Sequence, residues 1–339
     1  MPTPNIIEVE HLTKVFPNGV TAVNDVSFAV AEGEIFGFLG PNGAGKSTTI
    51  AVLTTLLAPT RGVVRVAGVD VCRHPTQARF AFGYVSQDLA VDDNLTGAQN
   101  LRLQAGFYHL PRAEAAARMG EVLRMVDLTD RAGDLVETYS GGMRKRLDIA
   151  CGLIHRPRLL FLDEPTLGLD IQTRREIWRY ITELRAQINM TIFLTTHYME
   201  EADALCDRVA IIDYGTIKAL GEPAAMKRAL GGDRVQFRFA SGSAEEVQQA
   251  VAIVQGLPAV TQVQALGECD YQAVVQDGET AVPQLFAALA GQPARIGSIA
   301  MQRPTLDDVF LHYTGRALRE GGGGRDEAFR ERMVMRRLK

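Results

Sequence analysis

The residues from Gly40 to Ser47 read Gly-Pro-Asn-Gly-Ala-Gly-Lys-Ser, and they constrain the fold of this chain more than any other stretch. They fit the phosphate-binding pattern G-x-x-x-x-G-K-[ST]. The largely apolar run 34–39 before the loop predicts a buried strand, and residues 47–57 after it predict a helix that ends before Pro59. A strand, a loop and a helix N-terminus in this order direct backbone N–H groups and the positive end of a helix dipole toward one point. The complete match in this context predicts a nucleotide phosphate site and makes a chance glycine-rich turn an unsatisfactory explanation.

The side chains of this loop indicate its chemistry. Gly43 and Gly45 allow backbone conformations and a close approach that a side chain would obstruct. Lys46 can reach the outer phosphates of a nucleotide, and the hydroxyl of Ser47 can ligate Mg²⁺. We therefore expect a nucleotide to bind here together with Mg²⁺.

Length, charge and cysteine content narrow the class of protein. A chain of 339 residues is long enough for about two domains, and 36 basic against 40 acidic residues give a net charge of −4, which is no footprint for nucleic acid. The four cysteines are scattered and predict reduced thiols, with neither a disulfide framework nor a zinc site. We find no signal peptide and no apolar run of the roughly 18–20 residues that a spanning helix needs. We expect a chain that is soluble, or that reaches a membrane only through a partner.

Polar side chains follow two further predicted buried strands. Asp163 and Glu164 end the apolar run 159–162, and His197 ends the run 191–196. Open α/β sheets bind ligands at the carboxyl ends of their strands, so an ordinary solvated acidic turn is a weak explanation for the two acids. Asp163 is suited to coordinate Mg²⁺ through water, and Glu164 to act as general base on an attacking water. A single histidine is usually an unremarkable polar residue, but at this strand end His197 can contact a γ-phosphate.

Residues 88–138 interrupt the α/β pattern with amphipathic helices predicted at 96–110 and 112–126. Gln87 stands at the entrance of this insertion, where it is either a solvated loop residue or a sensor between the phosphate site and the helices. The small residues Ser140, Gly141 and Gly142 then precede a helix predicted at 144–153, which forms a second anion site by the same dipole argument. Two such sites raise the question whether the second one serves a nucleotide held by another subunit.

An aromatic residue lies in the predicted turn 16–19, ahead of the phosphate loop. Phe16 can stack on an adenine face, or it can be an ordinary packed aromatic at a turn. Its place just before a nucleotide loop makes the two readings equally good.

Together these residues resemble the ATP-binding subunit of ATP-binding cassette (ABC) transporters, in the order typical of that family and over about residues 6–221. The resemblance implies an α/β P-loop ATPase domain with a helical insertion, an adenine-stacking Phe16, a Q-loop at Gln87, a signature segment at 139–143 and a switch histidine at His197. It implies ATP and Mg²⁺ as ligands, with Glu164, His197 and Gln87 catalytic, and with Ser47, Gln87 and Asp163 at the metal. It also implies a trans-ATP contact from Ser140, Gly141 and Gly142, and a dimer contact from Asp170. The implied nucleotide-binding residues are Phe16, Gly40, Pro41, Asn42, Gly43, Ala44, Gly45, Lys46, Ser47 and Thr48.

The signature segment departs from the usual Leu-Ser-Gly-Gly-Gln at its outer positions, where this chain has Tyr139 and Met143. Because Ser140, Gly141 and Gly142 are intact, we expect the function to survive. Within the family, Met143 and the closing stretch 304–310 look most like daunorubicin-resistance-type drug exporters.

The resemblance implies a motor subunit of an exporter for a hydrophobic drug or lipid-like compound. Two such subunits, expected to be identical, would close head to tail on ATP and drive a separate membrane permease from the cytoplasmic face of the membrane. The alternative is a non-transport ABC ATPase of translation or DNA repair, which would have tandem cassettes or a long coiled coil. A P-loop small-molecule kinase would have no reason to combine Gln87, His197 and the Ser140–Gly142 segment.

The last third of the chain predicts a separate small domain. We place domain boundaries at 1–221 for the ATPase, 222–315 for an accessory domain, and 316–339 for a glycine-rich joint with a basic tail. The accessory domain has the order β-α-β-β-α-β, which is the ferredoxin-like α+β arrangement. It has no catalytic cluster, so we expect it to support dimerisation, with a regulatory ligand site as the sharper alternative. The tail predicts either an amphipathic helix at a lipid or permease surface or, as we expect, disorder.

Overall fold

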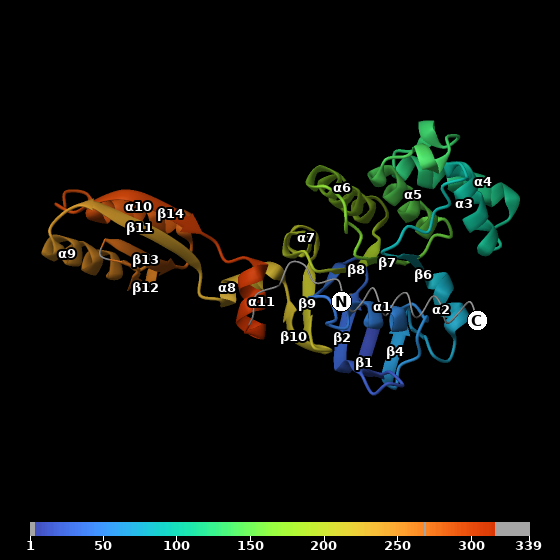
Figure 1. Ribbon diagram of the computed structural model, residues 1–339, viewed down its shortest axis with the longest axis horizontal. Coiled ribbons are helices and arrows are strands. Elements are labelled where there is room, and N and C mark those ends of the chain that lie inside the picture. Colours follow the sequence, from blue (N-terminus) through green and yellow to red (C-terminus); the bar gives the residue numbers. More distant parts are fainter. Residues whose placement is uncertain (1–3, 268, 316–339) are drawn as a thin grey trace. The chain divides into compact units, whose positions relative to one another are not determined.

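The structure is a computed structural model that describes residues 4–267 and 269–315 (Figure 1). Contacts divide the chain into two compact units, with the boundary between Glu222 and Pro223. None of the helices in the described ranges is long and apolar enough to cross a bilayer. The glycine-rich joint and basic tail predicted for residues 316–339 lie outside the described residues.

A mixed six-stranded sheet, in the order β10-β9-β3-β8-β7-β6, forms the centre of the first unit. Its strands are β3 (Ile35–Leu39), β6 (Phe82–Val85), β7 (Leu159–Asp163), β8 (Thr191–Thr196), β9 (Arg208–Asp213) and β10 (Thr216–Gly221). All neighbours in the sheet pair in parallel except β10, which is antiparallel to β9. Every residue of β3, β7 and β8 is buried, as continuous and largely apolar runs in a covered parallel sheet require.

A second, antiparallel sheet has the order β2-β1-β4-β5 and packs with α1 (Lys46–Leu53) on the central sheet. Its strands are β1 (Asn5–Val15), β2 (Thr21–Ala31), β4 (Arg61–Val66) and β5 (Val69–Asp70). Aromatic rings fill the shared core: the ring of Phe28 on β2 stacks on Phe36 of β3, 5.6 Å between centroids, and also lies against Phe193 of β8. This core holds β3 and α1, and therefore the loop between them, in a fixed place.

Helices connect the strands of the central sheet. α2 (Pro75–Ala81) precedes β6, α6 (Ile171–Ile188) joins β7 to β8, and α7 (Met199–Leu205) joins β8 to β9. The predicted helical insertion lies between β6 and β7. This insertion, predicted at residues 88–138, contains α3 (Gly97–Phe107), α4 (Arg112–Met125) and the short 3₁₀ turns η1 (Thr129–Arg131) and η2 (Val136–Thr138). It is followed by α5 (Gly141–Leu153), which leads to β7. Figure 1 shows α3, α4 and α5 grouped on one side of the central sheet and the antiparallel sheet on the other.

The second unit has the predicted β-α-β-β-α-β order within its own antiparallel sheet, β12-β13-β11-β14. Its elements are α8 (Pro223–Ala229), β11 (Asp233–Ser241), α9 (Ala244–Gln255), β12 (Val260–Ala265), β13 (Asp270–Val275), α10 (Gly278–Leu289), β14 (Arg295–Gln302) and α11 (Leu306–Thr314). Val235 and Phe237 of β11 pack with Val254 of α9 and Leu285 of α10 in a core of the unit's own. The order predicted from the sequence is confirmed.

Several predicted element ends are wrong. The helix predicted at 47–57 ends at Leu53, because Thr55 has a positive φ of 65° and the N–H groups of Leu56 and Leu57 both turn back to the carbonyl of Ala51. The helix predicted to reach Leu110 ends at Phe107.

Other elements are longer than predicted. The strands predicted at 6–10 and 26–30 belong to the longer β1 and β2, whose side-by-side pairing extends them beyond the alternating stretches. The helix predicted at 144–153 begins earlier, at Gly141, because Ser140 caps it.

Candidate active site

Four neighbouring strands end at one edge of the central sheet, and the candidate residues follow them. The phosphate loop follows β3, His197 follows β8, Asp163 and Glu164 close β7, and Gln87 follows β6. Since these strands are adjacent and parallel, in the order β3-β8-β7-β6, their carboxyl ends bring the four segments together. The expectation of a ligand site at this edge is consistent with the topology.

The phosphate loop depends on glycine at two positions. Gly45 is the N-cap of α1 and has a φ of 109°, and a Cβ on it would lie 2.5 Å from the carbonyl oxygen of Ala22. A Cβ on Gly40 would lie 2.3 Å from the carbonyl oxygen of Ile212. No side chain caps α1, so the donors of its first turn are available to an anion.

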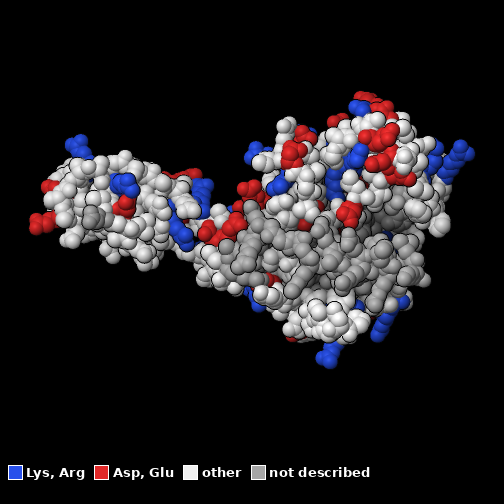
Figure 2. All heavy atoms as spheres, in the orientation of Figure 1, with Lys and Arg blue, Asp and Glu red and all other residues white. Residues whose placement is uncertain are grey.

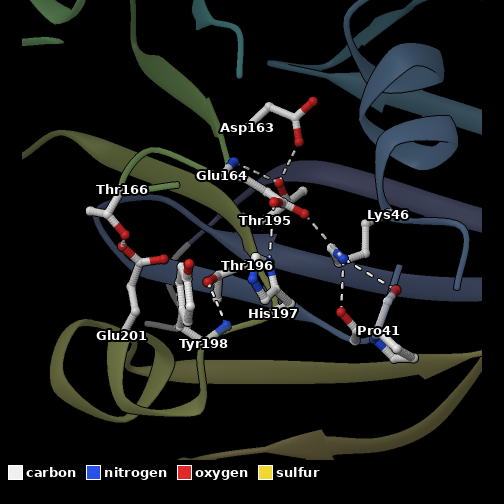
Figure 3. Close-up of polar contacts among 11 residues, drawn as sticks. Pro41, Lys46, Asp163, Glu164, Thr166, Thr195, Thr196, His197, Tyr198 and Glu201 are labelled. Atoms are coloured by element: carbon white, nitrogen blue, oxygen red, sulfur yellow. Dashed lines mark hydrogen bonds and ion pairs between the residues drawn. The ribbon is translucent and has the colours of Figure 1, made fainter. Parts of the chain in front are cut away.

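Lys46 is turned inward and holds both the loop and an acid (Figure 3). Its Nζ donates to the carbonyl oxygens of Gly40, at 2.7 Å, and Pro41, at 3.2 Å. The same Nζ lies 3.2 Å from Oε1 of Glu164, and the two side chains are only 4% and 7% exposed. This buried ion pair joins the phosphate loop to the end of β7.

Glu164 contacts a second residue of the site on its other oxygen. Its Oε2 lies 3.1 Å from Nδ1 of His197. Burial by itself raises the pKa of Glu164, but the hydrogen bond with His197 and the positive charge of Lys46 together outweigh it and hold the pKa below its usual value. Glu164 also has a positive φ of 47°, a conformation that non-glycine residues adopt rarely and mostly at functional sites. An ionised carboxylate held in this way can orient and deprotonate a water.

A threonine that the sequence analysis did not single out orients both acids. The hydroxyl of Thr195 donates to Oδ1 of Asp163, at 2.5 Å, and accepts the backbone N–H of Glu164, at 3.1 Å. Thr195 lies on β8 opposite Asp163 of β7 in the parallel register. The signal available in the sequence was a pair of threonines just before His197 at the end of a buried strand.

Gln87 carries the kind of atom that a metal site needs. Its Oε1 is buried and accepts no hydrogen bond from the residues that the structure describes. Amide, hydroxyl and carboxylate oxygens are the ligands that Mg²⁺ prefers. The donor set of Ser47, Gln87 and Asp163 therefore fits Mg²⁺. In the described ranges no group of three or more His, Cys, Asp or Glu side chains could hold a metal on its own.

The residues Ser140, Gly141 and Gly142, here called the Ser140 segment, lie at the start of α5. Ser140 and Gly141 are exposed, and the Ser140 hydroxyl accepts the N–H of Met143 as the N-cap. Figure 1 places α5 among the helices of the insertion, apart from α1.

Close packing explains two other residues of the signature segment. A Cβ on Gly142 would lie 2.8 Å from Cγ2 of Thr173 on α6, so glycine allows α5 to approach that helix. Tyr139 is buried and its hydroxyl donates to the carbonyl of Arg131, 2.5 Å away, while a Cβ on Gly97 would lie 2.5 Å from that hydroxyl. The unusual Tyr139 is therefore accommodated by a glycine at the start of α3.

The structure describes the surroundings of the predicted dimer contact, Asp170, and of the predicted adenine contact, Phe16. Asp170 is the exposed N-cap of α6 and accepts both the N–H of Thr173, at 3.0 Å, and its hydroxyl, at 2.6 Å. These bonds lower the pKa of Asp170. Phe16 lies in the turn between β1 and β2, with Nζ of Lys14 5.5 Å from its ring centroid.

A cavity of about 410 Å³ lies away from this edge, next to the residues that precede β7 and β8. Arg118 and Arg156 in its wall are both paired with Glu121, and Arg158 is paired with Glu32. None of the candidate site residues lines this cavity, so it is not the candidate site.

The parallel strands of the central sheet bring a phosphate loop together with a carboxylate and a histidine. An exposed serine and glycine begin another helix. This combination defines an ATPase of the ABC class. The comparisons agree: a family model described as ABC transporter matches residues 23–167, and one described as ATP-binding protein DrrA1-3-like, C-terminal domain, matches residues 221–314. The chain belongs to the family of ABC transporter ATP-binding proteins, and it is an ATP-binding ATPase.

The relatives cover nearly the whole chain. The daunorubicin resistance ATP-binding protein DrrA2 of Streptomyces coeruleorubidus is 41% identical over 298 residues, which cover 87% of this chain and 90% of that protein. The linearmycin resistance ATP-binding protein LnrL of Bacillus subtilis is 37% identical over 315 residues, which cover 93% and 100%. A solved dimeric structure of a post-hydrolysis state of the ATP-binding cassette MJ0796, bound to ADP and Pi, is similar with a TM-score of 0.57 at 26% identity and covers 64% of this chain and 98% of that one. These relatives favour a transporter subunit over an ABC ATPase of translation or DNA repair.

Proposed function

We propose that this chain is the motor subunit of an exporter that moves a hydrophobic drug or lipid-like compound through a separate membrane permease. The observation that carries the proposal is the Glu164 carboxylate, buried between Lys46 and His197 at the edge of the sheet. The names of the relatives, which refer to daunorubicin and linearmycin resistance, support the type of cargo.

In this proposal Glu164 is the general base that takes a proton from the attacking water. His197 orients the Glu164 carboxylate and then contacts the γ-phosphate. When ATP enters, Lys46 exchanges part of its contacts with Glu164 and the loop carbonyls for the outer phosphates, which releases the carboxylate for the water. The remaining nucleotide contacts come from the loop residues 40–48, and from Phe16 at the base.

Ser47, Gln87 and Asp163 would hold Mg²⁺, with Thr195 fixing the orientation of Asp163. The metal would neutralise negative charge on the phosphates. The unpartnered oxygen of Gln87 is the observation of this chain that supports the assignment. Gln87 also stands where β6 enters the helical insertion, so it is suited to pass a change at the phosphates to the helices.

The partner expected at the Ser140 segment is a second copy of the chain. Ser140 and Gly141 are exposed at the N-terminus of α5, which Gly142 continues, and a γ-phosphate bound to the other copy is the anion that fits this helix start. Asp170 would contact the partner across the same interface. The dimeric relative with ADP and Pi supports this arrangement.

Bound to this permease, the chain would lie at the cytoplasmic face of the membrane. We further propose that residues 222–315 act as an accessory domain that supports dimerisation.

The test is the variant Glu164→Gln, whose amide keeps the shape of the side chain but cannot act as a base. We expect ATP turnover to fall by about 100- to 10,000-fold, the usual contribution of a general base. Light scattering at saturating ATP should find a dimer, and the same variant without ATP is the control. Full turnover, or a monomer under all conditions, would contradict the proposal. A pull-down in mild detergent from native membranes should then recover a polytopic membrane protein.

A further inference from the structure

A fully buried glutamate lies behind the candidate active site. Glu201 on α7 has no exposed surface. Its Oε1 accepts two hydrogen bonds, from the hydroxyl of Thr166 at 2.7 Å and from Nε1 of Trp178 at 2.9 Å. Figure 3 shows the first of these bonds, with Glu201 and Thr166 on the far side of the Glu164 and His197 side chains from Lys46.

The three elements joined by Glu201 each continue into a residue of the site. Thr166 lies in the loop directly after Glu164. Trp178 lies on α6, whose N-cap is Asp170. Glu201 itself lies on the short helix that follows His197. One carboxylate oxygen therefore connects the segment of the general base, the segment of the histidine and the helix of the predicted dimer contact.

Packing alone does not explain a glutamate at position 201. Burial raises the pKa of Glu201, and contacts with Thr196, Thr166 and Trp178 counteract this only in part. Its second oxygen, Oε2, has no hydrogen-bond partner in the described chain. Among the charged groups nearby is Arg174 of α6, whose guanidinium lies over the ring of Tyr198, 3.9 Å from its centroid. Burying an acid with an unpartnered oxygen costs free energy compared with an apolar side chain. The stability of the fold therefore does not explain why a glutamate lies here.

We propose that Glu201 is a positioning residue of the ATPase reaction, which holds the loop after Glu164 against the helix after His197 and so fixes the contact between these two side chains. The inference rests on the proposed roles of Glu164 and His197. Glu201 touches neither nucleotide nor water in this scheme. It acts on the geometry of the pair, whose atoms lie 3.1 Å apart.

Two variants change this network without leaving a large cavity. Thr166→Val keeps the shape of a fully buried side chain and removes the donor, and Glu201→Gln keeps one acceptor oxygen and removes the charge. We expect Thr166→Val to lower kcat by about a hundredfold at an unchanged KM for ATP, because a small misplacement of catalytic groups has an effect of this size while the phosphate loop is untouched. Glu201→Gln should retain more activity than Glu201→Ala. Glu200→Gln, at the exposed neighbouring glutamate, is the matched control and should behave as the wild type.

The chain contains a reporter for this network. Trp178 is its single tryptophan, and its indole donates to Glu201. We expect the emission of Trp178 to change when ATP is added to the Glu164→Gln protein, and this change to be lost when Glu201→Ala is combined with it. A role of Glu201 in folding alone would lower the unfolding midpoint but leave the response of the folded molecules to ATP intact.

Unchanged kcat in folded Thr166→Val and Glu201→Gln would overturn the inference. It would also be overturned if the control Glu200→Gln lost as much kcat and kcat/KM as these two variants. The Glu164→Gln variant, assayed in parallel, separates the two proposals. If it is inactive while the Glu201 variants are fully active, only the positioning role fails. If it turns over ATP at the wild-type rate, the assignment of the base fails.

Discussion

Lys46 and Glu164 form an ion pair of 3.2 Å in which both side chains are buried. The positive charge of Lys46 helps to keep the Glu164 carboxylate ionised. A nucleotide that binds to the phosphate loop must therefore compete with Glu164 for Lys46.

Replacing Lys46 by Met leaves the buried Glu164 carboxylate with His197 as its remaining side-chain partner among the residues that the structure describes. The pKa of Glu164 should rise, because burial is no longer opposed by the lysine charge. Removing one partner of a buried pair typically lowers the free energy of unfolding by about 3–5 kcal/mol. Urea unfolding at pH 7 measures it. Lys46→Met,Glu164→Gln, which removes both charges, should recover part of the loss, and an equal stability of Lys46→Met and wild type would disprove the pair's contribution.

The hydroxyl of Thr195 should matter more than its shape. Thr195→Val removes the bonds to Asp163 and to the N–H of Glu164 while it preserves the volume in β8. Groups that orient metal ligands usually contribute about 10- to 100-fold to metal affinity or activity, so we expect a loss of this size in turnover at limiting Mg²⁺. Thr195→Ser retains the hydroxyl and serves as the control. Equal activities of the Val and Ser variants across a Mg²⁺ titration would rule out this role.

Gly141 and Gly142 are neighbours on α5 but should differ in their tolerance of alanine. A Cβ at 142 would meet Thr173 Cγ2 at 2.8 Å, and Thr173 cannot turn away without losing its bond to Asp170. At 141 the nearest atom is Leu169 Cδ2, at an ordinary 3.6 Å. Thermal unfolding should find Gly142→Ala destabilised by about 1–3 kcal/mol, as for other overpacked sites. Gly141→Ala should be neutral or slightly stabilised, and the reverse order would show that the α5–α6 approach is not tight.

The stability of the protein should depend on pH through His155, which follows α5. Its ring stacks on Tyr108 with centroids 3.6 Å apart, and burial lowers the pKa of His155 from 6.5 to about 4, although the carbonyl of Phe82 opposes this. The unfolded chain therefore takes up a proton first as the pH falls. This contribution to stability is intact above pH 6.5 and is lost toward pH 4, by about 2 kcal/mol at pH 5.

The variant His155→Phe keeps the stack and removes the titration, so its stability should fall less between pH 7 and pH 5 than that of the wild type. Burial raises the pKa of Asp148 to about 6, and this group titrates with the opposite sign, so the difference between the two proteins isolates His155. His109→Asn, at an exposed histidine nearby, is the control. Parallel urea midpoints for His155→Phe and wild type at both pH values would contradict the prediction.

The sequence predicted the site best where a motif dictates the local backbone. The loop around Lys46, and the strand ends at Glu164 and His197, follow from short apolar runs and glycine spacing, which are local properties. Thr195, Glu201 and Trp178 were not predicted. Their importance lies in partners far away in the sequence. Only Thr195 has a local signal, the pair of threonines before His197, and the sequence around Glu201 and Trp178 does not distinguish them from ordinary core residues.

Helix ends were also predicted poorly from the sequence. Residues 54–57 are as compatible with a helix as those before them, but the turn back to Ala51 ends α1 early. In the second unit, by contrast, the sequence predicts helices that begin at Ala244 and Leu306. Both starts agree with the structure, where Ser243 and Thr305 form complete capping boxes.

The placement of the helical insertion has a consequence for how such a chain can diversify. β6 and β7 are adjacent and parallel, and parallel neighbours always need a long connection between them. The insertion occupies that connection, so its length and sequence can change without altering the register of the strands that hold Gln87 and Glu164. We therefore expect related chains to vary the helices that are proposed to act on the permease while they keep Gln87 and Glu164 at the same edge of the sheet.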